Sequence, residues 1–372
     1  MLNLEKTGMP DLDAFHEELL AKNYDGLWRI GAKALTSSPA NVGLPTMWKW
    51  DEAHKLLMKA KDLVDPQLFK GGERRVLLFS NPEFGGQQAT HSMTSTFQLV
   101  KAGEKEASHR HSPDALRFML KGRATTIVNG EPIEMNEGDL ITTPGGSWHG
   151  HMNNSTDDAY WLDGVMAPLP ILLRGMFFEP HPSKGLQPVE YTPSYSRALV
   201  GNGRLRPKNK PKVPDYPAMV YPIQEVYEEL KIQKKYGELD PFDGYMVEYI
   251  NPVTGGSLMR QMSASMQLLP VGFESKAHQH SSSVIYHVYQ GEGYSVIDGK
   301  RFDWKKGDTF AVPVWCVHEH VNTSENKESL LFSFSDEPIM RAAGLYREQE
   351  FTENNDNKKG IGIKQNRELY ST

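Results

Sequence analysis

Apolar and polar residues alternate on both sides of two short turn sequences, VNGE (128–131) and IDGK (297–300). An alternation with a period of two predicts β-strands that have one buried face. Asn-Gly and Asp-Gly favour two-residue hairpin turns, because both central positions require positive φ. We therefore expect antiparallel strands joined by tight hairpins in two separate parts of the chain.

Helical periodicity is found in two segments of the N-terminal part of the chain. Residues 11–23 and 51–64 are predicted to form helices, and the second segment carries one apolar stripe. Residues 200–223 contain several prolines among lysines and arginines, which indicates an extended, solvated connection between domains rather than a polyanion-binding element. The polar residues from Thr352 onward are expected to be poorly ordered. The stripe consists of Ala53, Leu56, Leu57, Ala60, Leu63 and Val64.

An internal repeat organises the rest of the chain. The sequence matches itself without gaps at an offset of 169 residues, and even the two hairpin turns coincide. Two repeated units of about 100 residues favour a pair of β-barrels or sandwiches over a long array. The matching residues are Gly103, His109, His111, Gly122, Gly138, Asp139, Pro144, His149 and Asn153 with Gly272, His278, His280, Gly291, Gly307, Asp308, Pro313, His318 and Asn322.

These patterns divide the chain into five expected regions. A helical arm covers 1–70 and a first barrel covers 71–180. A linker region follows over 181–240, a second barrel over 241–340, and a C-terminal helix with a polar tail over 341–372.

Composition narrows the class of protein. The 372 residues are 38% hydrophobic and carry a formal net charge of −6, which argues against a general nucleic-acid or membrane-surface binder. Cys316 is the single cysteine, so an internal disulfide is excluded and a reducing compartment is favoured. The charged N-terminus does not resemble a signal peptide, and no run reaches the roughly eighteen apolar residues of a membrane span. A cytoplasmic location is expected.

Three histidines of the first copy have the spacing of metal ligands. His109 and His111 are two residues apart on an expected strand, so their side chains share one face. The return strand should bring His149 beside them. Three neutral imidazoles that leave coordination positions open suit a divalent first-row metal that also binds substrate.

The segments GEKEASHRH (103–111) and GDLITTPGGSWHGHMN (138–153) resemble both signature motifs of the cupin barrel. The usual cupin glutamate ligand is absent, because Ala115 and Leu116 stand where it would fall. In lacking this glutamate and in having two copies of the barrel, the sequence resembles the gentisate 1,2-dioxygenase family. That family includes salicylate and 1-hydroxy-2-naphthoate dioxygenases. The resemblance covers roughly residues 25–350. It implies a mainly β bicupin fold, with two double-stranded β-helix (jelly-roll) barrels and an N-terminal helical arm.

The same resemblance implies the chemistry. One Fe(II) per N-terminal barrel would bind an aromatic acid together with the co-substrate O2. The ring would open between the carboxyl-bearing carbon and the neighbouring hydroxylated carbon, so gentisate would give maleylpyruvate. A homotetramer is also implied by the family, not by the residues themselves.

Arg117 and His151 are the expected catalytic residues. Arg117 shares the parity of the histidines, so a regular strand would aim its guanidinium at the metal, where it could hold a carboxylate through two hydrogen bonds. His151 should also face inward, and it could hydrogen-bond the substrate or transfer a proton. A solvent-facing arginine and a core histidine are the simpler alternatives.

Other expected substrate-binding residues rest on the family pattern. Arg74 is preferred over the adjacent Arg75 as a second anion-binding residue, although parity alone cannot choose between them. Gln98 would line the pocket and Asp163 would orient a neighbouring group, with ordinary β-sheet roles as an equal alternative. The small polar residues at 94–96 favour a hydroxylated single ring over a naphthalene.

The second copy keeps the ligand spacing with His278, His280 and His318, so it could bind a second metal. The positions that correspond to the two arginines hold Tyr286 and Asp243. We therefore expect chemistry in the first barrel, and either a structural metal or no metal in the second.

The favoured function is that of a gentisate 1,2-dioxygenase. A salicylate or 1-hydroxy-2-naphthoate 1,2-dioxygenase is the nearest alternative, and a non-catalytic bicupin that binds a small acid is the alternative of another class. Cys316, although it lies between expected ligands of the second copy, is interpreted as a small buried residue.

Overall fold

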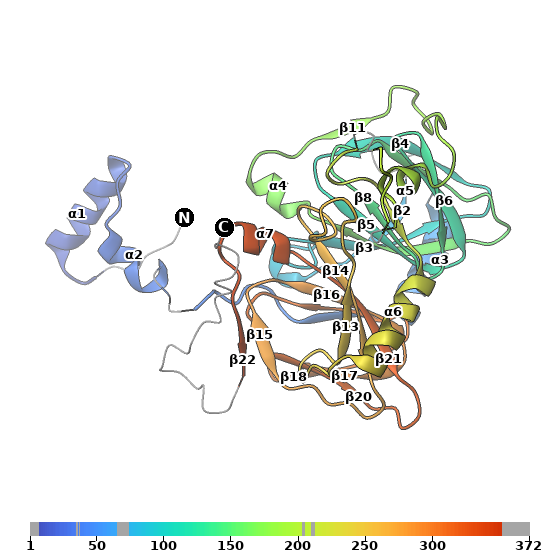
Figure 1. Cartoon of the computed structure of the whole chain (residues 1–372). Coiled ribbons are helices and arrows are strands. Elements are labelled where there is room, and N and C mark those ends of the chain that lie inside the picture. Colours follow the sequence, from blue (N-terminus) through green and yellow to red (C-terminus); the bar gives the residue numbers. More distant parts are fainter. Residues whose placement is uncertain are drawn as a thin grey trace. The chain divides into compact units, whose positions relative to one another are not determined.

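A computed structural model describes most of the chain (Figure 1). The described residues are 7–34, 36, 38–64, 74–202, 205–209 and 213–351. The predicted polar tail from Thr352 lies outside them. The chain divides into two compact units, Met1–Ala40 and Asn41–Thr372.

The first unit contains two helices, α1 (Pro10–Ala21) and α2 (Leu27–Ala34). Pro10 occupies the first turn of α1, where its missing N–H costs nothing. The indole of Trp28 donates a hydrogen bond to His16 Nε2 over 3.0 Å. Helix α1 lies where the sequence predicts one.

The second unit contains two barrels, and the first consists of two antiparallel sheets. One sheet has the order β12-β8-β5-β10-β3-β2, and the other has the order β11-β4-β9-β6-β7. The strands are β2 (Arg75–Leu78), β3 (Thr94–Val100), β4 (Lys105–His111), β5 (Ala115–Lys121), β6 (Arg123–Val128), β7 (Glu131–Asn136), β8 (Leu140–Thr143), β9 (His149–Met152), β10 (Ala159–Val165), β11 (Phe178–Pro180) and β12 (Val220–Tyr221).

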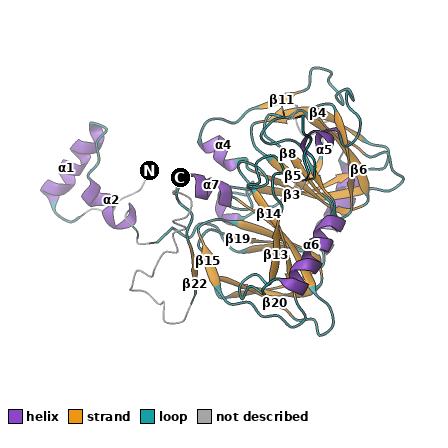
Figure 2. Cartoon of the chain, in the orientation of Figure 1, coloured by secondary structure: helices purple, strands orange, loops and turns teal. Residues whose placement is uncertain are grey.

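The second barrel repeats this arrangement with sheets β1-β19-β16-β21-β14-β13 and β18-β17-β20-β15-β22. The described chain is thus mainly β, as the sequence predicts (Figure 2). The strands are β1 (Thr46–Trp48), β13 (Tyr245–Glu248), β14 (Ser263–Leu269), β15 (His278–His280), β16 (Val284–Gln290), β17 (Glu292–Ile297), β18 (Lys300–Lys305), β19 (Thr309–Val312), β20 (His318–Asn322), β21 (Ser329–Ser335) and β22 (Glu348–Glu350).

The remaining helices lie between and beside the barrels. They are α3 (Trp50–Leu63), α4 (Pro168–Leu172), α5 (Tyr195–Val200), α6 (Ile223–Tyr236), α7 (Glu337–Ala342) and the short 3-10 helix η2 (Pro82–Phe84). Helix α3 forms where its apolar stripe predicts it. The expected linker region also contains α5 and α6, and the expected helical arm contains strand β1. No described helix is both long enough and apolar enough to cross a membrane.

Each barrel receives an edge strand from the segment that precedes the other barrel. Strand β1 precedes the first barrel but pairs with β19 of the second. Strand β12 precedes the second barrel but pairs with β8 of the first. A helix follows each exchanged strand, α3 after β1 and α6 after β12.

The repeated Gly-Asp pairs explain how these helices begin. Asp308 accepts a hydrogen bond from the backbone N–H of Trp50 at 3.0 Å, and Asp139 accepts one from Ile223 at 3.1 Å. Each aspartate therefore satisfies a free N–H at the start of the helix that follows the exchanged strand. Gly307 has a φ of +94°, and a Cβ there would lie 2.8 Å from the Trp50 side chain. The turn requires glycine for both reasons.

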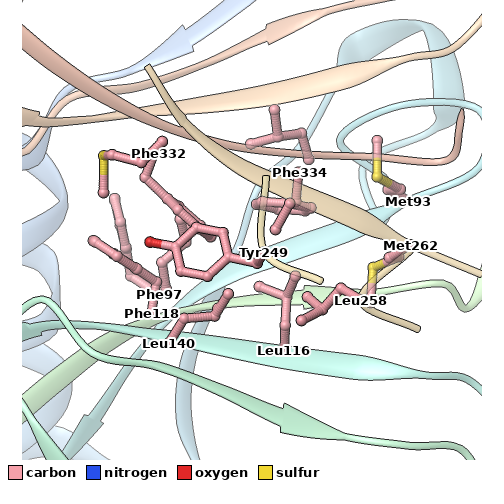
Figure 3. Close-up of a cluster of buried hydrophobic side chains, with 14 of the residues drawn as sticks. Met93, Phe97, Leu116, Phe118, Leu140, Tyr249, Leu258, Met262, Phe332 and Phe334 are labelled. Carbon is pink, nitrogen blue, oxygen red and sulfur yellow. The ribbon is translucent and has the colours of Figure 1, made fainter. Parts of the chain in front are cut away.

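The largest hydrophobic core joins the two barrels (Figure 3). It lies between the two six-stranded sheets, and the rings of Phe118 and Phe332 stack there at 4.1 Å. Smaller cores fill each barrel, around Trp161 in the first and Trp304 in the second. Because residues alternate along β5, Phe118 packs between the barrels while the side chain of its neighbour Arg117 projects into the first barrel.

Candidate metal centre and substrate site

Two strands of one sheet bring three histidines together in the first barrel. His109 and His111 lie on β4 and His149 lies on β9, opposite His109 in the antiparallel pair. The ring of His149 lies 4.2 Å from that of His109 and 4.8 Å from that of His111, measured between centroids. The three candidate donor nitrogens lie within 4.8 Å of one another. The spacing read from the sequence therefore corresponds to a real cluster.

The orientation of two of these rings, His111 and His149, suits a metal, whereas Nδ1 of His109 faces Arg74. The Nδ1 atoms of His111 and His149 lie 3.0 and 2.9 Å from the carbonyl oxygens of Pro113 and Ser147. A carbonyl only accepts, so each Nδ1 carries the proton and each Nε2 keeps a lone pair. The Nε2 of His149 is buried and has no hydrogen-bond partner among the described residues. A divalent metal fits such a donor set.

Electrostatics keeps the three rings neutral. Burial, with a contribution from Arg74, lowers the pKa of His109 to about 2. Burial also lowers the pKa of His111 to about 4, and it places that of His149 well below the ordinary value. Neutral imidazoles are the form that binds metal ions.

Arg117 reaches the cluster from the opposite sheet. It lies on β5 and pairs across the strands with Asp163 of β10, whose carboxylate is 3.3 Å from Arg117 Nε. Its Nη1 donates a hydrogen bond to Thr143 over 2.6 Å, and the residue is 3% exposed. The Nε atom makes no hydrogen bond within the described part of the chain. Because Nε faces the Asp163 carboxylate and Nη1 donates to Thr143, Nη2 is the remaining donor, for which no hydrogen bond is recorded among the described residues.

The two adjacent arginines near the start of the first barrel have different partners. Arg74 Nη2 lies 2.7 Å from His109 Nδ1, and Arg74 Nε lies 3.6 Å from a carboxylate oxygen of Glu106. Arg75 instead donates two hydrogen bonds to Glu104, at 2.6 and 2.8 Å. The structure therefore places Arg74 at the histidine cluster and gives Arg75 a different partner.

Glu106 is a residue of the site that the sequence reasoning missed. Gln98 donates to both of its carboxylate oxygens, at 2.8 and 2.7 Å, and Glu106 is 4% exposed. Burial raises the pKa of Glu106 to about 7, although Arg74 and Gln98 oppose the shift.

An irregularity in β4 hid this residue. Glu106 has the opposite parity to the metal histidines, so a regular strand would turn it outward. The register between β4 and β9 shifts, however, so Glu106 lies opposite His151 while His109 lies opposite His149. Three residues of β4 thus face two of β9, which is a β-bulge. Glu106 consequently shares the inner face of the sheet with all four histidines.

His151 and Asp163 complete the inner surface. His151 is fully buried, neither ring nitrogen has a partner among the described residues, and burial holds its pKa well below the ordinary value. Its ring lies 5.3 Å from that of Trp161, whose indole N–H donates to Asp163 over 3.0 Å. Thr96 also contacts this carboxylate, at 3.4 Å. Asp163 is thereby fixed beside Arg117.

The second barrel repeats the histidine cluster. The ring of His318 lies 4.3 Å from that of His278 and 4.9 Å from that of His280. Carbonyl oxygens again hold Nδ1 of His280 and His318, and Nε2 of His318 is buried without a partner in the described chain.

The surroundings of the second cluster lack the two arginines of the first. Tyr286 and Ser333 form the cross-strand pair where the first barrel has Arg117 and Asp163. Asp243, which accepts a hydrogen bond from Gln267 over 3.0 Å, replaces the second arginine. A cavity of about 240 Å³ lies here, and Glu337, Arg341 and Glu348 are among its lining residues. At the positions equivalent to Arg117 and Arg74, the second barrel therefore has no arginine that could bind an anionic ligand.

Comparison with known proteins agrees with this geometry. The cupin-domain family matches residues 96–165 and 265–334. A 5-aminosalicylate 1,2-dioxygenase from Comamonas sp is 36% identical over 94% of this chain and 93% of its own. A gentisate 1,2-dioxygenase from Aquipseudomonas alcaligenes is 34% identical over 90% of this chain and 95% of its own.

A solved structure extends the likeness to three dimensions. Salicylate 1,2-dioxygenase from Pseudoaminobacter salicylatoxidans, solved as an adduct with gentisate, superposes with a TM-score of 0.84. It is 28% identical, and the match covers 94% of this chain and 96% of that one. The duplicated barrels, the histidine clusters and these matches lead to one conclusion: the chain belongs to the gentisate dioxygenase family of bicupin ring-cleaving enzymes.

Proposed function

We propose that this enzyme is a gentisate 1,2-dioxygenase that uses Fe(II) and O2. It would open the gentisate ring between the carboxyl-bearing carbon and the adjacent hydroxylated carbon to give maleylpyruvate. The observation that carries the proposal is the buried Arg117, whose guanidinium lies in the first barrel with a cluster of three neutral histidines. A carboxylate beside a metal-binding group is what this pair of features would recognise.

His109, His111 and His149 would hold one iron in the first barrel. Fe(II) held by these residues would supply a redox-active Lewis acid that brings the acid and O2 together and allows electron transfer from the ring to oxygen. Three neutral ligands leave its positive charge uncompensated by protein. This charge favours a chelating anion, such as a carboxylate with an ortho phenolate.

The surrounding residues would bind and orient the acid. Arg117 would hold the carboxylate through charge-assisted hydrogen bonds, and Asp163 would keep the guanidinium in place. Arg74 would add a second positive charge near His109. Neutral His151, with both ring nitrogens free, could accept the phenol proton or hydrogen-bond the phenolate.

The nearest alternative is a salicylate or 1-hydroxy-2-naphthoate 1,2-dioxygenase with the same iron. Thr96, Gln98 and Glu106 place polar groups around the inner surface, which suits a hydroxylated single ring better than a naphthalene. A non-catalytic acid-binding bicupin would have no need for neutral histidines with a free Nε2 beside the arginines.

The decisive experiment loads the protein anaerobically with Fe(II) and then adds O2 with gentisate. Oxygen uptake and the absorbance of a ring-opened product are followed together, with salicylate and 1-hydroxy-2-naphthoate as parallel substrates. Gentisate should give the highest kcat/KM. Higher kcat/KM for another acid would reassign the substrate, and no turnover of any ortho-hydroxy acid would refute the enzymatic proposal.

The second cluster, His278, His280 and His318, is proposed as a metal site without this activity, because Tyr286 and Asp243 stand where an anionic substrate would need arginines. A metal-free second barrel is the alternative, and metal analysis decides between them. The homotetramer and the cytoplasmic location remain predictions.

A further inference from the structure

Glu106 is a buried carboxyl group at the histidine cluster to which the proposed mechanism assigns no role. It lies on the inner face of β4, turned there by the bulge between Glu106 and His109. Both of its carboxylate oxygens accept hydrogen bonds from Gln98 Nε2, and Arg74 Nε lies 3.6 Å from one of them. Each carboxylate oxygen has two lone pairs, so these contacts leave acceptor capacity.

The strand register places Glu106 at a definite height above the metal ligands. Glu106 lies opposite His151 and His109 lies opposite His149, so the two levels differ by two residues of β9. At a rise of about 3.3 Å per residue, this separation is roughly 7 Å along the strand. An aromatic acid that chelates a metal through its carboxylate and ortho hydroxyl spans a similar distance to the ring position para to that hydroxyl.

We propose that Glu106, supported by Gln98, is an acceptor subsite for a hydroxyl or amino group at that para position, carbon 5 of a 2-hydroxybenzoate. The inference rests on the proposed function and adds a substrate class to it. The enzyme would prefer 2-hydroxybenzoates that carry a hydrogen-bond donor at carbon 5 over those with hydrogen or chlorine there.

The environment of Glu106 makes such selection effective. Its carboxyl is already removed from water and held by Gln98 and Arg74, so little reorganisation accompanies binding. A substrate without a donor would leave the buried carboxyl facing an apolar group, which is unfavourable. Sites built to hydrogen-bond a substrate group discriminate strongly against analogues that lack it.

The test compares Glu106→Gln and Glu106→Leu with wild type. For each, kcat/KM is measured with gentisate, 5-aminosalicylate, salicylate and 5-chlorosalicylate after anaerobic Fe(II) loading. We expect Glu106→Leu to lower the ratio of kcat/KM for gentisate to that for salicylate by at least about tenfold, since the acceptor of the substrate's hydrogen bond is lost. 5-Aminosalicylate should follow gentisate, 5-chlorosalicylate should follow salicylate, and Glu106→Gln should lie between because its amide oxygen still accepts.

Glu104→Gln is the matched control. Glu104 immediately precedes β4 but pairs with Arg75, so its variant should keep the substrate ratios of wild type. Iron content and melting temperature establish that each variant is folded and loaded.

The outcomes separate the competing explanations. Equal losses for all four acids would mean that Glu106 only positions Arg74, and unchanged ratios would mean that it has no role in recognition; either result overturns the subsite. Failure of wild type to turn over any of the acids would instead refute the proposed function, and the subsite with it.

Discussion

Replacing Arg117 by Gln tests whether the buried guanidinium binds the substrate carboxylate. The change removes a positive charge and its planar pair of donors and keeps a side chain that can still hydrogen-bond Thr143. A hydrogen bond to a charged group contributes about 1.5–3 kcal/mol, and a bidentate pair makes two. With one weaker contact kept by glutamine, the net loss is about 3–4 kcal/mol, which corresponds to a fall of roughly 100- to 1000-fold in kcat/KM.

The assay is steady-state oxygen uptake with gentisate, combined with iron analysis of the same samples. Arg110→Gln is the matched control, because Arg110 lies on β4 between two metal histidines but pairs with the exposed Glu179 on the outer face. We expect its kcat/KM to match wild type. The loss in Arg117→Gln should appear chiefly in KM, because carboxylate binding precedes chemistry.

The variant also leaves Asp163 without its cation. Burial already raises the pKa of Asp163, and Arg117 opposes that shift, so removal of the arginine should favour the protonated carboxyl. The double variant Arg117→Gln with Asp163→Asn controls for this effect on folding. If Arg117→Gln, folded and iron-loaded, turns over low concentrations of gentisate as fast as wild type, the assignment of Arg117 is wrong.

Three further predictions concern the metal, the exchanged helices and the second barrel. His149→Ala should lose the iron of the first barrel, because one of three ligands is removed; metal analysis after desalting measures this, and iron retained at the wild-type level would contradict the assignment. Asp308→Ala should lower the free energy of unfolding by about 1–2 kcal/mol, because Trp50 loses its N-terminal hydrogen-bond partner; unchanged stability in urea titrations would refute that role. Burial raises the pKa of Asp243 from 3.8 to about 7. Between these pH values the folded state therefore keeps a proton that the unfolded state releases. The resulting contribution to stability is complete below about pH 4 and is lost as the pH rises through 7. In chelator-treated protein, Asp243→Asn should therefore flatten the decline in stability between pH 5 and 8, and an unaltered slope would contradict the shift.

The histidine clusters could be predicted from the sequence because their signal is local and duplicated. Each copy has two histidines at strand spacing and a third after a hairpin turn. Because this spacing occurs twice, few alternatives to a histidine cluster remain. Arg117 was also identified, although the parity argument assumed one continuous strand. In the structure β4 ends at His111 and β5 begins at Ala115 in the opposite sheet, so the guanidinium faces the histidines across the barrel.

Other features of the structure depend on strand register or on pairing between strands far apart in the sequence. Composition and periodicity do not predict either of these. The bulge in β4 reverses the parity of Glu106 relative to His109, and the sequence alone gives no sign of it. The pairing of β1 with β19 joins residues more than 250 positions apart, so the N-terminal arm could be predicted as helical but its strand could not. The helix α6 has a regular charged face, yet the prolines that precede it favoured an extended linker.

The reciprocal edge strands mean that neither half of the gene encodes a complete barrel. A cut between β11 and β12 would give two fragments, each carrying an edge strand of the other barrel. Such fragments would have to reassemble mutually, as in split-protein complementation. Strand β12 also borders β8, which pairs with the strand that carries Arg117. Damage to the second half of the chain would therefore affect the barrel that contains Arg117.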